Sequence, residues 1–292
     1  MENRITGHTA LYCLIGSPVS HSGSPAMHNY SFSKRGIDAV YLAFDVPLEN
    51  ISNAVEAIKT FHIKGFNITM PGKTAIMDYL DKVSPAAQLI GACNTVIVTE
   101  DGKMTGYNTD GQGFIDNLRV HNVEVKGKKL LILGTGGAAN AISIQAALEG
   151  AAEIIIFNRK DEFFANGQKI VDKLTTAVPK CKVEMCDLDE RKRLADEIKN
   201  SDILVNATKV GMKPLDQETL IPAELLHSNL IVADTVYNPL ETRLLREAKK
   251  AGCKVISGIG MLLWQGAAAF RLFTGQEMPV KEVEEKFFSS ME

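Results

Sequence analysis

The sequence predicts an α/β fold with largely parallel sheets, divided into two domains. Apolar runs of strand length alternate with amphipathic stretches along the whole chain, which is typical of this class. A polar, glycine-containing link at Val125–Lys129 separates two series of such elements. A glycine-rich turn follows the first strand of the second series. We therefore expect an N-terminal α/β domain over residues 1–115 and a second domain over residues 116–260.

The first series contains five expected strands, which are Leu11–Ile15, Tyr41–Val46, Gly65–Ile68, Cys93–Thr99 and Met104–Tyr107. Amphipathic stretches between and after them predict helices at Pro25–Arg35, Glu49–Phe61, Thr74–Ile90 with an interruption at Pro85, and Gly111–His121. Asp110 stands where an acidic residue caps the last of these helices. The dipeptide Asp101-Gly102 favours a tight turn, so the last two strands should form a hairpin.

The second series begins at Leu130 and predicts six strands, namely Leu130–Leu133, Glu153–Phe157, Lys182–Met185, Asp202–Val205, Leu230–Asp234 and Lys254–Ile256. Helices fill the intervals, and Gly150 and Gly252 are placed as C-terminal stops. Two further helices, Met261–Phe273 and Val280–Ser289, follow without another strand. Six strands separated by helices predict a doubly wound parallel sheet.

Composition excludes several function classes. The net charge of −3 argues against a nucleic-acid partner, because such proteins carry a clustered basic excess. No run approaches the roughly 20 apolar residues of a membrane span, and the N-terminus does not resemble a signal peptide. The five cysteines are scattered and the six histidines lack metal-ligand spacing, so we expect reduced thiols, no metal site and a cytoplasmic, soluble protein.

A candidate cofactor loop follows the strand Leu130–Leu133. It comprises Gly134, Thr135, Gly136, Gly137 and Ala138. Glycines permit the sharp turn and the close approach of a pyrophosphate, and the following helix offers its free N–H groups to the phosphates. The third glycine of the common motif is replaced by Ala139, and a tight turn without a ligand is the alternative. The strand before, the helix after and a second strand ending about twenty residues on favour a Rossmann dinucleotide-binding domain.

The end of that second strand should select the cofactor. It reads Asn158, Arg159, Lys160, Asp161. An acidic side chain here accepts hydrogen bonds from an unphosphorylated ribose, whereas arginine favours a 2′-phosphate. Because both are present, we expect NAD as cofactor with some tolerance for NADP; a solvated turn that selects neither is the alternative.

Polar motifs also lie at strand ends of the first domain. Ser22 and Ser24 precede a helix, where they would cap it or bind a ligand carboxylate. Lys73 and Asp110 form a plausible proton-transfer pair, since a carboxylate can orient an ammonium group whose pKa partial burial lowers. Taken singly, a capping serine and a surface lysine are the ordinary interpretations. Oxidation of an alcohol to a ketone nevertheless needs such a pair, because the hydroxyl proton must leave.

At these residues the chain resembles the shikimate dehydrogenase family, nearly from end to end. The matching segments are Ser22–Pro25, Asn67–Lys73, Gly91–Thr95, Asn108–Gly111, the Gly134 loop, Asn206–Thr208, Tyr237–Pro239 and Gln265-Gly266. The resemblance implies a substrate-binding first domain, a dinucleotide-binding Rossmann domain, and final helices at 261–292 that return to the first domain. It also implies NAD(P)-dependent oxidation of shikimate to 3-dehydroshikimate, a reaction of the shikimate pathway of aromatic amino acid biosynthesis.

The resemblance implies a role for each matching position. Lys73 and Asp110 would be the catalytic acid–base pair, with Lys73 carrying the proton. The substrate would be bound by Ser22 and Ser24 at its carboxylate and, at or near its ring hydroxyls, by Asn67, Thr69, Asn94, Tyr237 and Gln265. The cofactor would contact the Gly134–Ala138 loop, the turn Asn158, Arg159, Lys160 and Asp161, and the residues Thr208 and Lys209. Thr235, Val236 and Gly258, with Tyr237, would line its nicotinamide end.

Two departures point to the quinate/shikimate dehydrogenase branch, whose members use NAD or NADP and act on quinate as well. NADP-specific members follow the Asn-Arg pair with a hydroxyl residue and another basic residue, whereas this chain has Lys160–Phe163. Lys209 stands where many relatives have a small hydroxyl residue, although an exposed loop lysine is the alternative. A dehydrogenase for another hydroxylated ring acid and a non-catalytic dinucleotide-binding regulator are the rival functions, and a homodimer is an assembly that the sequence leaves open.

Overall fold

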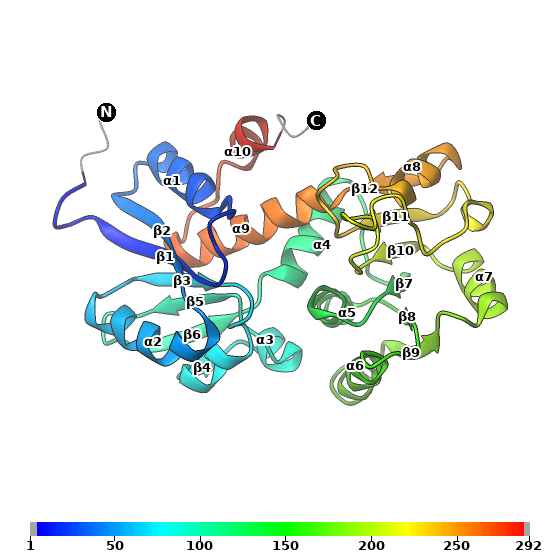
Figure 1. Ribbon diagram of the computed structural model, residues 1–292, viewed down its shortest axis with the longest axis horizontal. Coiled ribbons are helices and arrows are strands. Elements are labelled where there is room, and N and C mark those ends of the chain that lie inside the picture. The colour runs from blue at the N-terminus through cyan, green and yellow to red at the C-terminus, as the bar shows by residue number, and fades with distance from the viewer. Residues whose placement is uncertain (1–4, 289–292) are drawn as a thin grey trace. The chain divides into compact units, whose positions relative to one another are not determined.

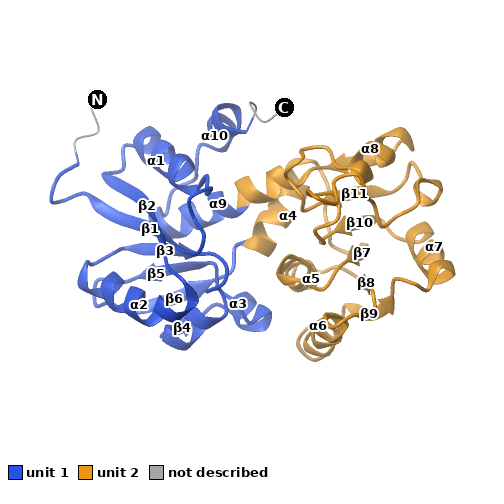
Figure 2. Cartoon of the chain, viewed as in Figure 1, with its two compact units in different colours: residues 1–109, 265–292 blue, residues 110–264 orange. Residues whose placement is uncertain are grey.

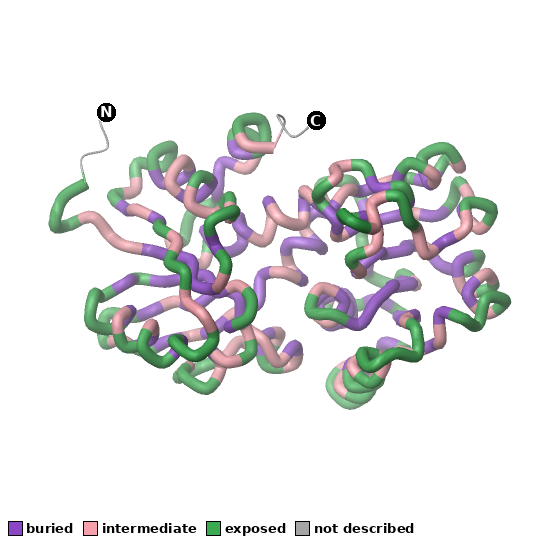
Figure 3. Tube along the Cα trace, viewed as in Figure 1, coloured by how far each residue is buried: buried purple, intermediate pink, exposed green. Residues whose placement is uncertain are grey.

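The structure is a computed structural model, and it describes residues 5–288. The chain divides into two compact units (Figure 2). The first unit comprises the chain up to Thr109 together with the chain from Gln265 onward, and the second comprises Asp110–Trp264. In each unit the buried segments follow the central strands, as Figure 3 shows. Each unit therefore has its own core.

The first unit is built on a six-stranded sheet in the order β2-β1-β3-β5-β6-β4 (Figure 1). Its strands are β1 (Ala10–Gly16), β2 (Ala39–Asp45), β3 (Gly65–Ile68), β4 (Lys82–Val83), β5 (Thr95–Val98) and β6 (Met104–Tyr107). β1 runs parallel to β2 and β3, whereas β5 is antiparallel to both β3 and β6. The predicted β5–β6 hairpin is confirmed, and it makes this sheet mixed.

The predicted helix Thr74–Ile90, interrupted at Pro85, is confirmed from Pro85 onward and is wrong before it. The segment forms a 3-10 helix η2 (Ala75–Tyr79), the short strand β4 and the helix α3 (Pro85–Ile90). Ser84 caps α3 by accepting a hydrogen bond from the Ala87 N–H at 3.3 Å. Pro85 lacks an N–H and so starts the helix, while the chain before it pairs with β6.

Helices cover the first sheet. They are α1 (Ser24–Arg35), α2 (Ile51–Thr60) preceded by the 3-10 turn η1 (Leu48–Asn50), the second half of α9 (Gly258–Thr274) and α10 (Val280–Phe287). α1 ends at Gly36, whose φ of 66° suits glycine. Lys34 of α1 pairs with Glu282 of α10 at 2.7 Å, so the C-terminal segment packs on the first unit. The predicted end of the last helix, Ser289, lies outside the described residues.

The second unit has a six-stranded, all-parallel sheet in the order β12-β11-β10-β7-β8-β9. Its strands are β7 (Lys129–Leu133), β8 (Glu153–Asn158), β9 (Lys182–Asp187), β10 (Ile203–Asn206), β11 (Ile231–Asp234) and β12 (Lys254–Ile256). Its helices are α4 (Asp110–Val120), α5 (Gly137–Leu148), α6 (Phe164–Ala177), α7 (Arg191–Lys199), the 3-10 turn η3 (Ala223–Leu225), α8 (Arg243–Lys250) and the start of α9. The predicted doubly wound sheet is confirmed.

Strand order decides where functional residues gather. The chain reverses its direction of growth across the second sheet between β7 and β10, and the carboxyl ends of parallel strands beside such a point form the usual ligand crevice.

Among the described residues, none of the helices is both long and apolar enough to span a membrane.

Candidate functional site

Two of the polar residues singled out in the first unit, Asn67 and Asn94, meet in the middle of its sheet, where β3, β5 and β6 lie side by side. Asn67 lies on β3 and pairs in register with Thr95 of β5, which in turn pairs with Tyr107 of β6. Because β5 is antiparallel to both neighbours, its first residue lies beside the last residues of β3 and β6. Asn94 and Thr109 therefore come together with Asn67, although they are far apart in sequence.

A buried hydrogen-bond network joins these residues. Asn67 Nδ2 donates to Asn94 O at 3.1 Å and to Thr95 Oγ1 at 2.9 Å, while its Oδ1 accepts from the Tyr41 hydroxyl at 2.7 Å. Asn94 Oδ1 accepts from the Thr109 N–H at 2.8 Å, and Asn94 Nδ2 donates to Thr109 Oγ1 at 3.0 Å. Both amide groups are thereby fixed in orientation before any ligand arrives.

Tyr41, Thr95 and Thr109 are parts of this site that sequence reasoning missed. Tyr41 is fully buried on β2, and its ring stacks on buried His28 with centroids 4.4 Å apart. Burial raises the pKa of Tyr41 well above its ordinary value, so the hydroxyl remains a donor to Asn67. A tyrosine within an apolar strand gives no signal of this kind, because its partner lies 26 residues away in sequence.

The loops after β1 and β3 carry the remaining first-unit candidates. Ser22 Oγ accepts a hydrogen bond from the Ser24 N–H at 3.2 Å, but neither serine caps α1, whose N-cap is Gly23. Both serines are half-buried at the start of that helix, where the dipole favours an anion. Thr69 is half-buried as well, and its N–H donates to Ile15 O at 2.9 Å.

The two expected proton-transfer residues lie in different units. Lys73 is half-buried in the loop after β3, and its carbonyl accepts from the Cys93 N–H at 2.8 Å, which places its backbone next to Asn94. Asp110 is the first residue of α4 instead of its cap, and its side chain is half-buried in the first helical turn. Gln265 lies within α9, also half-buried.

The glycine loop of the second unit has the shape that a pyrophosphate requires. Gly134 has a φ of 103°, and a Cβ there would lie 2.8 Å from Thr208 Cγ2 and 2.9 Å from Ala207 O. At Gly136 and Gly137 a Cβ would meet no protein atom within 4 Å, so these two positions face open space. No side chain caps the first turn of α5, which leaves its N–H groups for an anion. These residues fit a dinucleotide.

The turn after β8 is held by local contacts. Asp161 Oδ1 accepts from Asn158 Nδ2 at 3.0 Å and from the Phe163 N–H at 2.9 Å. Lys160 pairs with Asp187 at 3.3 Å, and Arg159 is exposed. Thr135 of the glycine loop donates to Phe163 O at 3.0 Å, which ties this turn to the loop. Asp161 is thus fixed and exposed in the turn that follows β8.

Two further loops leave the same edge of the second sheet. The loop after β10 carries Thr208 and the exposed Lys209, and the loop after β11 carries Thr235, Val236 and the partly exposed Tyr237. A Cβ at Gly258 would lie 2.5 Å from Val236 O and 2.6 Å from the Thr235 carbonyl carbon. Gly258 therefore packs directly on this loop.

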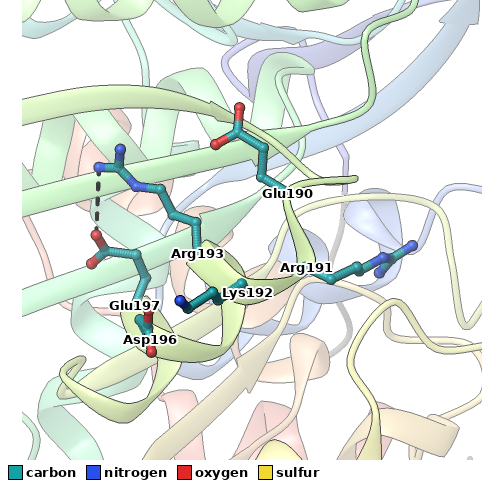
Figure 4. A pocket seen from close by; sticks show the side chains of 6 residues that line it. All are labelled: Glu190, Arg191, Lys192, Arg193, Asp196 and Glu197. Carbon is teal, nitrogen blue, oxygen red and sulfur yellow. Dashed lines mark ion pairs between the residues drawn. The ribbon is translucent and has the colours of Figure 1, made fainter.

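Two surface hollows lie elsewhere on the second unit. One, of about 490 Å³, is lined by charged residues at the start of α7, where Arg193 pairs with Glu197 (Figure 4). None of the catalytic, substrate-binding or cofactor-binding residues predicted from the sequence lines this hollow. The other, of about 520 Å³, includes Arg159 together with Arg191, Arg243 and the segment 219–224. Only the second touches a predicted cofactor residue.

Comparisons with known proteins show which family the chain is similar to. The family model for the shikimate dehydrogenase substrate binding domain matches residues 14–96, and that for the shikimate 5'-dehydrogenase C-terminal domain matches residues 258–286. The chain is 50% identical over 289 residues to shikimate dehydrogenase (NADP(+)) of Listeria innocua, covering 99% of both chains. It is 44% identical to quinate/shikimate dehydrogenase of Escherichia coli, covering 95% of this chain and 97% of the relative. Shikimate 5-dehydrogenase of Listeria monocytogenes, solved with shikimate and NAD, matches with a TM-score of 0.96 at 49% identity over 99% of both chains.

Proposed function

Because this chain belongs to the shikimate dehydrogenase family, we infer that it catalyses the reversible NAD(P)-dependent oxidation of shikimate to 3-dehydroshikimate. Oxidation of quinate to 3-dehydroquinate is the second activity we propose, since a relative bears both substrates in its name. Two features of the chain carry the proposal. The first unit holds a cluster of oriented amide and hydroxyl groups around Asn67 and Asn94. The second unit holds a glycine loop followed by a helix, α5, whose N-terminus no side chain caps.

The first unit supplies the proposed substrate site. Ser22 and Ser24 bind the carboxylate at the N-terminal turn of α1, where the helix dipole stabilises negative charge. Asn67 and Asn94 present oriented amides to the ring hydroxyls. Thr69 and Gln265 of the same unit, together with Tyr237 of the second unit, complete the set of groups that we assign to the substrate.

Proton transfer is assigned to Lys73 and Asp110. The oxidised alcohol must lose its hydroxyl proton, and the Lys73 amine takes it up as general base and returns it in the reverse direction. Asp110 is the carboxylate that we assign to orient the Lys73 amine during this transfer. The nicotinamide ring, when bound, supplies the hydride acceptor.

The second unit supplies the proposed cofactor site. The loop Gly134–Ala138 and the first turn of α5 hold the pyrophosphate, and the turn after β8 holds the adenosine end. Thr208, Lys209, Thr235, Val236 and Gly258 lie at the nicotinamide end. Asp161 favours an unphosphorylated ribose, so we propose NAD as the preferred cofactor with NADP accepted.

The function is tested by initial rates of reduced-nicotinamide formation, with shikimate and quinate each measured against NAD and NADP. Turnover of either acid supports the dehydrogenase, and turnover with NAD supports the assignment of Asp161. Dinucleotide binding without turnover of either acid would instead favour a regulator of the same fold. Turnover of a third hydroxylated ring acid, with neither of these two used, would correct the substrate.

Replacement of Asp161 by asparagine is expected to raise the ratio of kcat/KM for NADP to that for NAD by about tenfold. Asparagine keeps the acceptor that Asn158 and Phe163 use, and it removes the charge that repels a 2′-phosphate. A tenfold change corresponds to ~1.4 kcal/mol, the order of one partly screened charge interaction. Glu162→Gln, which removes the exposed neighbouring charge, is the control and should leave the ratio within about twofold. An unchanged ratio in the Asp161 variant would contradict its role.

We also propose a cytoplasmic location, supported by five buried cysteines that form no disulfide. Association into a homodimer stays a prediction.

A further inference from the structure

A buried carboxyl group, that of Asp234, lies at the carboxyl end of β11 and was not among the residues predicted from the sequence. Asp234 is only 1% exposed. Its Oδ1 accepts from the Val236 N–H and from Asn206 Nδ2, both at 2.9 Å, and its Oδ2 accepts from Thr242 Oγ1 at 2.7 Å. Three donors from three places in the chain thus converge on one side chain.

Two of these donors close the loop after β11. Val236 lies two residues beyond Asp234, and Thr242 is the N-cap of α8, where its hydroxyl accepts from the Leu245 N–H at 3.3 Å. The carboxylate therefore bridges the beginning and the end of the segment 235–242. Gly258 also packs against the backbone of residues 235 and 236, which therefore have little freedom to shift.

The third donor extends the network to the neighbouring loop. Asn206 ends β10, and its Nδ2 also donates to Val210 O at 2.9 Å. Its Oδ1 accepts from Thr208 Oγ1 at 2.7 Å and from the Thr208 N–H at 3.2 Å. The loop 207–211 is thereby closed on Asn206, and Asp234 holds Asn206.

We propose that Asp234 is a positioning residue that fixes the two loops at the nicotinamide end, 207–211 and 235–242, in a single arrangement. The inference rests on the proposed function, because that function assigns Thr208, Thr235 and Tyr237 of these loops to the cofactor and substrate. Asp234 itself touches neither ligand; it acts through Asn206, Val236 and Thr242.

The chemistry of the site supports a carboxylate here. All three partners donate, so a charged acceptor satisfies them better than a neutral amide, which must turn one N–H₂ group toward a donor. Burial raises the pKa of Asp234 to about 6, and the hydrogen bonds to Val236, Thr242 and Asn206 oppose that rise. Removing a carboxylate from water costs free energy. We therefore interpret the burial of Asp234 as a sign that the loop must be held in place.

The test compares Asp234→Asn with Asp202→Asn in the full-length protein. Asp202 immediately precedes β10 at the opposite edge of the same sheet and likewise accepts from a backbone N–H, that of Lys129 at 2.9 Å. We expect Asp234→Asn to lower kcat about tenfold or more, because small displacements of reacting groups are costly. The KM for shikimate should change less than kcat, because most of the assigned substrate residues lie in the first unit and only Tyr237 lies on a loop that Asp234 holds.

Binding measurements separate this effect from general unfolding and from failure of the proposed function. The fluorescence of bound reduced NAD reports on the nicotinamide end, and inhibition by adenosine monophosphate reports on the adenosine end. We expect Asp234→Asn to change the fluorescence of bound reduced NAD and to leave the inhibition by adenosine monophosphate unaltered. The fluorescence readout stands even if neither acid is turned over by the wild-type protein.

A second pair of variants tests the link through Thr242. Thr242→Val removes the hydroxyl and should reproduce the loss of kcat, whereas Thr242→Ser keeps it and should restore turnover. Wild-type fluorescence and turnover in both Asp234→Asn and Thr242→Val would overturn the proposal. Equal weakening of reduced NAD and adenosine monophosphate, together with a lowered melting temperature, would also overturn it in favour of a purely structural role.

Discussion

Replacement of Lys73 by alanine is expected to lower kcat for shikimate oxidation by about two to four orders of magnitude, the usual contribution of a positioned acid–base group. Alanine removes the amine that accepts the hydroxyl proton and leaves no other proposed base on the loop after β3. The backbone of Lys73 remains bonded to Cys93, so the loop itself should hold its shape. Steady-state rates across pH, with melting temperatures as a check on folding, measure the effect.

Two further variants make this result specific. Lys73→Arg keeps the positive charge but cannot release a proton near neutral pH, so we expect a similarly low kcat. Lys64→Ala removes an exposed lysine just before the amino end of the same strand, β3, and should leave kcat within about twofold. Near-normal turnover by Lys73→Ala would remove the residue from the mechanism.

The pairing of Lys73 with Asp110 has its own signature. If the two act as a unit, the double variant Lys73→Ala/Asp110→Asn should be about as slow as the slower single variant. Additive losses would mean that each residue acts alone. The comparison matters because the two residues belong to different compact units. Their spacing in the sequence does not predict that they act together.

Local signals made much of the second unit predictable. A buried strand, a glycine turn and a helix start lie within a dozen residues at β7, and each is fixed by neighbouring backbone geometry. The same holds for the hairpin of β5 and β6, where Asp101-Gly102 sets the turn. The prediction for residues 74–84 failed because their apolar spacing suits a helix, whereas the pairing of β4 with β6 involves residues about twenty positions away.

The residues that hold the proposed substrate-binding and cofactor-binding side chains in place could not be predicted from the sequence, for a similar reason. Asn67 and Asn94 were found through motifs, but Tyr41, which orients Asn67, lies on an apolar strand and resembles any core aromatic residue. Asp234 ends a strand as many surface acids do, and only the fold shows that it is buried against Asn206 and Thr242. Motifs identify groups that meet ligands, whereas the groups that hold them depend on tertiary contacts.

Substitution of Gly134 by alanine is expected to weaken dinucleotide binding by at least about tenfold and to destabilise the fold by about 1–3 kcal/mol. The φ of 103° is one that residues with a Cβ rarely adopt, and the added atom would press on Thr208 Cγ2 at 2.8 Å and Ala207 O at 2.9 Å. The loop after β10 would have to move away from the glycine turn. Urea unfolding and titration with reduced NAD measure the two effects.

Gly136→Ala is the matched control, because it separates backbone strain from the space that the ligand needs. Its φ of −77° suits alanine, and the new Cβ meets no protein atom within 4 Å, so the free energy of unfolding should stay within about 0.5 kcal/mol of wild type. If the open space at Gly136 is where the pyrophosphate lies, the same variant should still bind dinucleotide more weakly. If Gly134→Ala loses stability, that glycine is needed for the shape of the turn. If Gly136→Ala loses only dinucleotide binding, that glycine is needed to make room for the ligand. Unchanged binding in both variants would mean that the cofactor does not use this loop.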